Sequence, residues 1–529
     1  MAREKEWFFT LFGICCCIKL LLLPAYRSTD FEVHRNWLAI THSLPVSDWY
    51  YEETSQWTLD YPPFFAWFEY LLSQVAEFFD KDMLIVTNLE YGSRATVVFQ
   101  RLSVIFTDSM LIYAVYRYIV CNLQGFRKEP LATSKVFILT SLLLFNFGLF
   151  VVDHIHFQYN GFLFGILLLS IQKTTAGSIP HGAFLFAVLL NFKHIFLYIA
   201  PAYFVYLLRE FCFRNTRKSS RMANLIGVDI FDLMISRLIG LGLIVSSVFL
   251  VSFGPFVYMG DLKQVLSRLF PVKRGLCHAY WAANFWSLYN LADKFLAIAG
   301  SKLGLHISST SQASMTGGLV AQQEHLVLPS VSALATAILT LATMLPSLLN
   351  IWYRPSGPKG FLRCLIICAY CSFLFGYHVH EKAVIMIIIP MCLLAVESKS
   401  DCRAFILLSV PGHFALFPLL YQPFETPLKV TLFLAYTVLS LAFLAKLHRC
   451  EISSFGLPFL NRIEALYIWG LVPLYIYCNA VHSMIGLSEK LPFVPLMLTS
   501  VYCTIGILCS WGVFYFKSMN FTTKDIKVS

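Results

Sequence analysis

Residues 181–208 read HGAFLFAVLLNFKHIFLYIAPAYFVYLL, and this stretch decides how often the chain crosses a membrane. It is too long for one span of about 20 residues and too short for two full spans. Asn191, Lys193 and His194 lie at its middle, and Pro201 follows them. Polar residues and helix breakers are tolerated at membrane depth where broken helices line a cavity inside the protein. The stretch therefore predicts two short helices that turn back near Lys193, and one long tilted helix is the alternative.

Apolar runs fill the rest of the chain as well. Of its 529 residues, 57% are hydrophobic and only 13% are charged. Soluble domains are about one quarter charged and disordered chains have low hydrophobicity, so both classes are excluded. We expect an all-α polytopic membrane protein that forms a single domain over residues 1–529. With 181–208 counted twice it has about 14 transmembrane helices, and the apolar runs lie at 7–25, 98–121, 136–152, 155–172, 181–208, 238–258, 330–352, 362–377, 383–396, 402–420, 427–446, 463–482 and 493–516.

The positions of Lys and Arg predict the orientation of these helices, because basic loops stay in the cytosol. If the N-terminus is cytosolic and 181–208 crosses twice, the basic loops 122–135 and 209–237 and the C-terminal tail are all cytosolic. This distribution explains the net charge of +10 without a nucleic-acid partner. Two long loops, 26–97 and 259–329, then lie on the far side of the membrane.

The first of these loops contains an amphipathic stretch at 63–80. Its aromatic and leucine residues suit a helix that lies in the membrane interface. A short transmembrane span is the alternative, but Glu69 and Glu77 argue against it.

Polar and ionisable residues gather at the far-side membrane boundary, and they come from six separate pieces of the chain. Such residues near a membrane are functional candidates. Carboxylates beside imidazoles suit general-base catalysis, and Lys and Arg suit an anionic phosphate. The candidates are Asp30, Glu32, Arg35, Asp60, Tyr61, Asp153, His154, His156, Gln158, Tyr159, Asn160, Lys193, His194, Arg268, Lys273, Arg274, His278, His378, His380, Glu381 and Lys382.

Some of these residues also have a plain structural interpretation. Asp30 suits a helix cap, the Pro-Pro pair after Tyr61 suits a turn, and His378 with His380 suits a solvated loop. The sequence has no Walker loop, no Gly-rich dinucleotide loop and no Ser nucleophile elbow, and no Cys/His spacing typical of zinc. A phosphate carried by a membrane lipid is therefore favoured over a nucleotide as the ligand.

Five motifs carry a family resemblance. The segments STDFEVHRNW (28–37), WTLDYPP (57–63), HFQYNG (156–161), LFP (269–271) with RGL (274–276), and HVHEK (378–382) together resemble the ER dolichyl-phosphate-glucose-dependent glucosyltransferases of N-glycan precursor assembly. The resemblance covers the whole chain. It implies a GT-C fold in the ER membrane with a luminal active site and cytosolic termini. It also implies that no metal or other cofactor is needed.

The resemblance implies an inverting single displacement from dolichyl phosphate glucose to a dolichyl-pyrophosphate oligosaccharide. The Asp-Phe-Glu motif of the family maps onto Asp30, which is thereby assigned as the general base. Candidates for the donor phosphate are Lys193, Arg268, Lys273, Arg274, His378, His380 and Lys382. The remaining candidates are expected to hold sugar hydroxyls or the acceptor.

Two further segments, FEVHRNWLAITHSLP (31–45) and GLCHAYW (275–281), favour a family member that adds the second glucose, in an α-1,3 linkage, to Glc1Man9GlcNAc2. The sibling that adds the first glucose to Man9GlcNAc2 is the nearest alternative. A transporter of lipid-linked sugars is an alternative from another class, but alternating access needs polar residues at both faces of the membrane.

Overall fold

The computed structural model describes residues 2–126, 132–215, 231–270, 275–277, 281–303, 325–450 and 456–521. Within these ranges helices and their connecting loops make up the chain apart from two three-residue strands, β1 (Phe213–Asn215) and β2 (Phe231–Leu233), which pair antiparallel. The predicted all-α fold class is confirmed, and the small hairpin is an addition that the apolar pattern does not reveal.

Helices of the first half of the chain are α1 (Ala2–Leu21), α2 (Thr29–Ser43), α3 (Pro63–Ala76), α4 (Arg94–Thr107), α5 (Ser109–Phe126), α6 (Ala132–Leu144), α7 (Phe147–Leu149), α8 (Asn160–Thr175), α9 (Ile179–Phe192) and α10 (Ala200–Leu207). Those of the second half are α12 (Ile235–Met259), α13 (Leu262–Leu269), α14 (Phe285–Lys302), α15 (Ala333–Tyr353), α16 (Gly357–Phe375), α17 (Ile385–Ala395), α18 (Lys399–Phe414), α19 (Thr426–Leu447), α20 (Arg462–Trp469), α21 (Leu471–Ile476), α22 (His482–Met484) and α23 (Val494–Met519).

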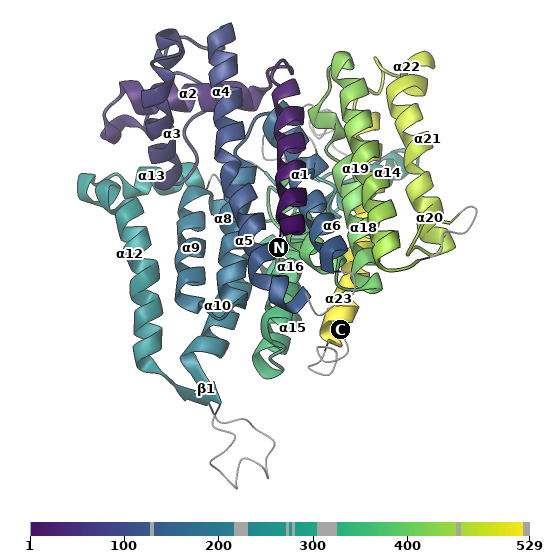
Figure 1. Cartoon of the computed structure of the whole chain (residues 1–529). Coiled ribbons are helices and arrows are strands. Elements are labelled where there is room, and N and C mark those ends of the chain that lie inside the picture. Colours follow the sequence, from purple (N-terminus) through teal and green to yellow (C-terminus); the bar gives the residue numbers. More distant parts are fainter. Residues whose placement is uncertain are drawn as a thin grey trace.

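Among the described residues, nine helices are long and apolar enough to cross a membrane. They stand side by side in Figure 1, with α2, α3 and α4 as a block at one end and β1 at the other. Shorter helices such as α8, α9 and α17 lie within the same bundle. The number of 14 transmembrane helices therefore stays a prediction, whereas the polytopic membrane architecture is confirmed.

The stretch 181–208 folds as two helical arms. α9 ends at Phe192, Lys193 is extended with φ −149° and ψ 113°, and the 3-10 helix η4 (His194–Ile199) leads into α10. α9 is antiparallel to α8: the ring of Phe192 lies 5.3 Å from that of Phe162 near the start of α8, while Ser170, further along α8, donates to the carbonyl of Gly182. The chain thus turns back at Lys193, and the alternative of one long helix does not hold.

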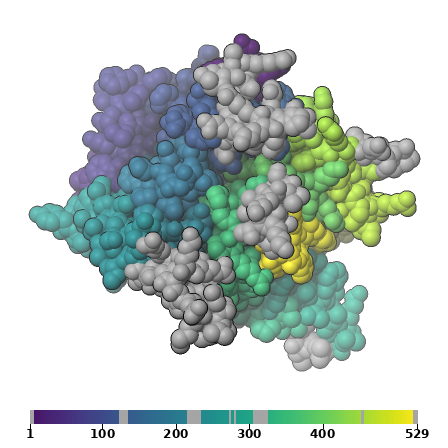
Figure 2. Space-filling view, turned by 60° about the horizontal axis from the view of Figure 1, so that its bottom comes forward, coloured from purple at the N-terminus to yellow at the C-terminus, as the bar shows by residue number. Residues whose placement is uncertain are grey.

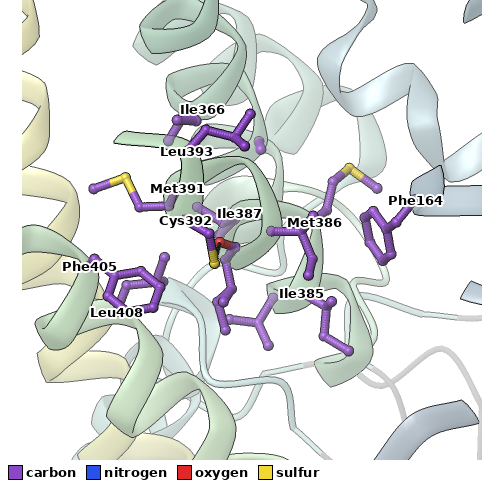
Figure 3. Packing of buried hydrophobic residues seen from close by; sticks show 14 of the residues in the cluster. Phe164, Ile366, Ile385, Met386, Ile387, Met391, Cys392, Leu393, Phe405 and Leu408 are labelled. Atoms are coloured by element: carbon purple, nitrogen blue, oxygen red, sulfur yellow. Dashed lines mark hydrogen bonds between the residues drawn. The ribbon is translucent and has the colours of Figure 1, made fainter. Parts of the chain in front are cut away.

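The core of the bundle is built around α17. All eleven residues of this helix are buried, and its sequence is apolar on every side, which is typical of a helix enclosed by others. In Figure 3, Met386 of α17 lies beside Phe164 of α8, while Phe405 and Leu408 of α18 approach from the opposite side. Because α17 is held on all sides, the loop that precedes it, 378–382, has a fixed position.

In the block at the upper left of Figure 1, α2, α3 and the first residues of α4 belong to the first long loop. The predicted amphipathic helix is present as α3, with Pro63 at its first position, where a missing N–H does no harm. Glu69 of α3 is fully buried and its Oε1 lies 2.7 Å from Nδ1 of His34 in α2. The carboxylate thus joins α2 to α3, and α3, with 14 residues, is shorter than a transmembrane span.

The opposite end of the bundle carries ion pairs between helices. Lys359 lies 3.1 Å from Glu397, and Arg403 lies 2.5 Å from Glu464. A view with this end turned forward (Figure 2) shows the green middle of the chain between the blue N-terminal helices and the yellow C-terminal helix. These basic residues lie at the end predicted to be cytosolic.

The turn at Lys193 generates a test of orientation. An N-glycosylation acceptor sequence inserted near Arg217, which lies outside the described residues, is expected to stay unmodified in microsomes, because α10 returns the chain to the cytosolic side. The same insertion after the exposed Leu89 is the positive control and should be modified. The measurement is an endoglycosidase-sensitive shift on a gel, and a shift for the Arg217 insertion would contradict the orientation.

Candidate active site

Asp30 is the carboxylate at which the predicted pieces meet. It is the second residue of α2. Its Oδ2 accepts hydrogen bonds from Lys382 Nζ at 2.5 Å and from Gln158 Nε2 at 2.6 Å. His156 Nε2 lies 3.5 Å from the same oxygen. Three motifs that are far apart in the sequence therefore converge on one side chain.

The surroundings of Asp30 keep it ionised. Burial alone would raise its pKa, but the neighbouring charges, of which Lys382 is the largest, outweigh burial and hold the pKa well below its usual range. For His156, burial and then the charge of Lys382 lower the pKa to about 3, so this imidazole is neutral at neutral pH. The site thus contains a carboxylate beside a neutral imidazole.

A set of backbone contacts fixes Asp30 beside His156. Arg101, a buried residue of α4, donates to the carbonyl oxygens of His154 at 2.6 Å and of Tyr26 at 2.9 Å. The hydroxyl of Ser28, which also caps α2, donates to the carbonyl of His156. The chain before α2 is thereby tied to the chain after the π-helix η3 (Phe150–Ile155). Hydrogen bonds from a charged donor are stronger than neutral ones, so Arg101 is the main link.

The side-chain amides next to Asp30 form a network in which each orientation is determined. Gln158 donates to Asp30, so its Oε1 is the acceptor of Asn160 Nδ2 at 2.8 Å. Asn160 Nδ2 also donates to Asp153 at 2.9 Å, which turns its Oδ1 toward Lys193 Nζ at 3.0 Å. Asp153 therefore orients Asn160 and does not itself line the cavity.

His154 is beneath the site. Its Nε2 lies 2.8 Å from Asp108 Oδ2, and Lys19 Nζ lies 2.5 Å from the same oxygen. All three side chains are buried. This group joins α1, the α4–α5 junction and η3, so the predicted candidate His154 supports the site without contacting it.

A cavity of about 400 Å³ lies against Lys382. Its apolar wall includes Phe164, Phe196, Leu197, Phe270 and Met386. Its polar wall is formed by predicted candidates: Asp60, Tyr61, Gln158, Asn160, Lys193, His194, His378, His380 and Lys382. Nine of the candidates thus line one cavity, as their clustering in the sequence predicts.

His378 joins the second long loop to this cavity. Its φ of 52° is unusual for a residue with a side chain. Its backbone N–H donates to the carbonyl of Leu276 at 2.8 Å, and its Nδ1 lies 3.0 Å from the carbonyl of Gly275. A carbonyl only accepts, so Nδ1 carries the proton, and the ring is fixed at the cavity wall.

Comparison with known proteins agrees with this geometry. Residues 15–514 match the ALG6, ALG8 glycosyltransferase family. The chain belongs to this family. The resemblance seen in the five motifs is thereby confirmed, and the protein is a hexosyltransferase of the GT-C membrane class.

Three similar proteins illustrate the match, and all three are named dolichyl pyrophosphate Glc1Man9GlcNAc2 alpha-1,3-glucosyltransferase. The protein from Bos taurus is 53% identical over 512 residues, which cover 97% of this chain and 95% of the relative. That from Mus musculus is 53% identical over 512 residues, with 96% and 95% covered. That from Arabidopsis thaliana is 45% identical over 526 residues, with 96% and 98% covered.

Glu32 and Arg35 belong to the first family motif, but they pair with each other away from the cavity. The two carboxylate oxygens of Glu32 accept hydrogen bonds from Arg35 Nη2 at 2.7 Å and Nε at 2.8 Å. Arg35 Nη1 donates to the carbonyl of Met83 at 2.9 Å, and the arginine is fully buried. The pair fastens α2 to the 3-10 helix η2 (Lys81–Leu84), and neither residue lines the cavity.

Other candidates also lie outside the cavity. Arg268 donates to Glu53 Oε1 at 2.6 Å and to the carbonyl of Tyr50 at 2.9 Å, so it fastens α13 to the first long loop. The hydroxyl of Tyr159 is buried 2.8 Å from that of Ser103. Glu381 is buried with Oε2 2.9 Å from His380 Nδ1. Three candidates lie outside the described residues: Lys273, Arg274 and His278.

Several site residues are not among the sequence candidates. The hydroxyl of Tyr26 donates to the carbonyl of Leu419 at 2.6 Å and lies 3.0 Å from His156 Nδ1, so it orients that ring. Tyr198 and Tyr377 line the cavity. For Tyr26 the available signal is its position two residues before the STDFEVHRNW motif, and for Arg101 it is a charge within an apolar run.

One acidic pair, Asp80 and Asp82, has the Asp-x-Asp spacing. This pattern can hold a metal and a nucleotide sugar. The carboxylate of Asp80 caps η2 and accepts hydrogen bonds from Tyr91, Ser93 and Thr96. Neither residue lines the cavity, so the pair fastens the turn before α4.

The paired geometry of Arg35 predicts a structural effect of its replacement. Arg35→Lys removes the two-pronged contact with Glu32, and we expect a loss of about 1–3 kcal/mol in stability. The melting temperature of the purified protein should fall, while the KM values of the folded enzyme stay unchanged. Glu32→Gln, which changes the other partner, should lower the melting temperature in the same way. An altered KM with an unchanged melting temperature would instead assign Arg35 to substrate binding.

Proposed function

We propose that the protein transfers glucose from dolichyl phosphate β-D-glucose to Glc1Man9GlcNAc2-PP-dolichol and forms an α-1,3 linkage at the luminal face of the ER membrane. We also propose that both termini are cytosolic. The observation that carries the proposal is the carboxylate of Asp30, kept ionised beside a cavity lined by Lys193, Lys382 and imidazoles. The names of the similar proteins support the identity of the acceptor.

The chemistry needs only one carboxylate. The 3-hydroxyl oxygen of the acceptor attacks C1 of the donor glucose, and the bond between C1 and the phosphate oxygen breaks with its electron pair remaining on the phosphate. Asp30 takes the hydroxyl proton, and dolichyl phosphate leaves as an anion. A retaining glycosidase would instead use two carboxyl groups about 5–5.5 Å apart. No general acid is required, because the leaving group is already a stable anion.

Lys193 is the candidate that best suits the donor phosphate. Its Nζ contacts two neutral carbonyl oxygens, of Asn160 at 3.0 Å and Gln158 at 3.4 Å, and lies 4.9 Å from the ring centre of Tyr61. Among the described residues, no carboxylate forms an ion pair with it. A cation in such surroundings favours an anionic ligand. We propose that Lys193 neutralises the phosphate without a metal and that His378 and His380 lie beside it.

The apolar wall of the cavity suits the dolichol chain. Phe196, Leu197 and Phe270 belong to this wall, and the side chains of Leu197 and Phe270 are 43% and 48% exposed. The wall therefore continues onto an apolar outer surface, and in a bilayer that surface faces lipid. A donor with its phosphate at Lys193 can extend its chain along this path.

Replacement of the base tests the reaction. Asp30→Asn retains the shape of the side chain but cannot take a proton, and we expect glucose transfer to fall by about 10²–10⁴-fold while expression and melting temperature are retained. The measurement is transfer from synthetic dolichyl phosphate glucose to the glucosylated acceptor by purified protein. Asp82→Asn, an exposed carboxylate of the same loop, is the matched control and should keep its activity. Transfer by Asp30→Asn close to that of the unmodified protein would remove Asp30 from the role of base.

The lipid-linked oligosaccharide that accumulates without the protein identifies its acceptor. We expect Glc1Man9GlcNAc2-PP-dolichol to build up in cells that lack it, because its consumption stops. Chromatography of released glycans measures this product. Accumulation of Man9GlcNAc2 would instead assign the protein to the first glucose, and transport of lipid-linked sugar by protein in liposomes, without glucose transfer, would assign it to another class.

A further inference from the structure

Lys382 stands between the proposed base and the cavity. Its Nζ bonds Asp30 Oδ2 at 2.5 Å, and its side chain lines the cavity, whereas Asp30 is not among the lining residues. Gln158, which holds the same oxygen at 2.6 Å, also lines the cavity. A hydroxyl that enters the cavity thus meets the ammonium and the amide before it meets the carboxylate.

The charge on Lys382 also weakens Asp30 as a base. A carboxylate that bonds an ammonium directly gives up part of its affinity for a proton, and the efficiency of a general base follows that affinity. The side chains of Lys382 and Asp30 are 10% and 22% exposed, so water screens this contact only partly. With Lys382 in contact, Asp30 is therefore a weaker base than it would be without this contact.

The two lysines of the cavity differ in their partners. Lys193 is held by amide oxygens, and its charge is directed at the cavity without a carboxylate in contact. Lys382 is held by a carboxylate. A phosphate beside Lys193 offers Lys382 a second anion, and lysine, a compact charge on a flexible stem, can exchange one anion for another.

We propose that Lys382 makes the base respond to the donor. Its ammonium bonds Asp30 while the cavity holds no phosphate, and it moves to the phosphate when the donor arrives. Only then can Asp30 accept a hydrogen bond from the hydroxyl of the acceptor. The inference rests on the proposed function and adds an order of binding, donor before acceptor. Gln158 keeps its contact with Asp30 throughout, so the carboxylate stays oriented after Lys382 leaves. The backbone of Lys382 does not need to move, because the 3-10 helix that carries it, Glu381–Val384, leads directly into the buried helix α17.

The first experiment needs no variant. The affinity of the purified protein for a short-chain Glc1Man9GlcNAc2-PP lipid is measured with and without a donor analogue in which CH2 replaces the oxygen between C1 and phosphorus. No transfer occurs with this analogue. We expect the acceptor to bind about tenfold more tightly when the analogue is saturating, within the usual range of coupling between sites. Equal affinity in both conditions would overturn the proposal.

The variant Lys382→Met separates this role from others. It removes the ammonium from Asp30, so acceptor affinity without any donor analogue should rise about tenfold, to the value of the unmodified protein with analogue, and the analogue should have no further effect. If Lys382 only binds the phosphate, the variant should bind the acceptor, in the absence of the analogue, as tightly as the unmodified protein does. If Lys382 only supports the fold, the variant should have both a lower affinity for the acceptor and a lower melting temperature. Either result contradicts the proposal.

Lys81→Met is the matched control, because Lys81 is 78% exposed in the same luminal region and lies away from the cavity. It should behave as the unmodified protein in both measurements. Glucose transfer by the unmodified protein with the natural donor is assayed in parallel. Absence of that transfer would refute the proposed function, whereas normal transfer with a donor-independent acceptor affinity would refute only the role of Lys382.

Discussion

The contact between Asp30 and Lys382 is the interaction on which the site depends, and it joins residues 352 positions apart in the chain. Both side chains are partly buried, and a charge removed from water needs a partner and additional hydrogen bonds. The helix α2, which carries Asp30, and the 3-10 helix η9 (Glu381–Val384), which carries Lys382 and leads into α17, must therefore be placed accurately. α2 is placed by polar contacts, namely the Arg101 link to two backbone carbonyls and the pairing of Arg35 with Glu32. α17 is placed by apolar packing on every side.

The broken stretch at Lys193 gives the same site its second cation. A continuous helix across 181–208 would carry Lys193 within the bundle, where its ammonium would lack solvent and ligand alike. The turn brings it instead to the level of Asn160 and Gln158, whose amide oxygens hold it. The irregular backbone that interrupts the apolar pattern is therefore what presents a positive charge to the cavity.

The apolar pattern and the clustering of charges predict much of this arrangement. Each apolar run contains a helix, the turn at Lys193 lies where polar residues interrupt the run, and nine of the predicted candidates share a cavity. What the sequence does not reveal is how each charge is paired. Arg35 and Arg268 are arginines, a residue type that commonly binds phosphate, but each already forms an ion pair with a carboxylate less than 3 Å away. Pairing over such distances depends on packing between distant segments, as does the contact of Tyr26 with His156.

The first long loop takes part in an apolar core that is distinct from the core of the bundle. Trp37 and Phe65 from the first loop pack there with Val265 and Leu269, which belong to α13. Since translation proceeds from the N-terminus, the first long loop is made well before α13. The apolar core beside Asp30 is therefore complete only after the start of the second long loop has been added to the chain.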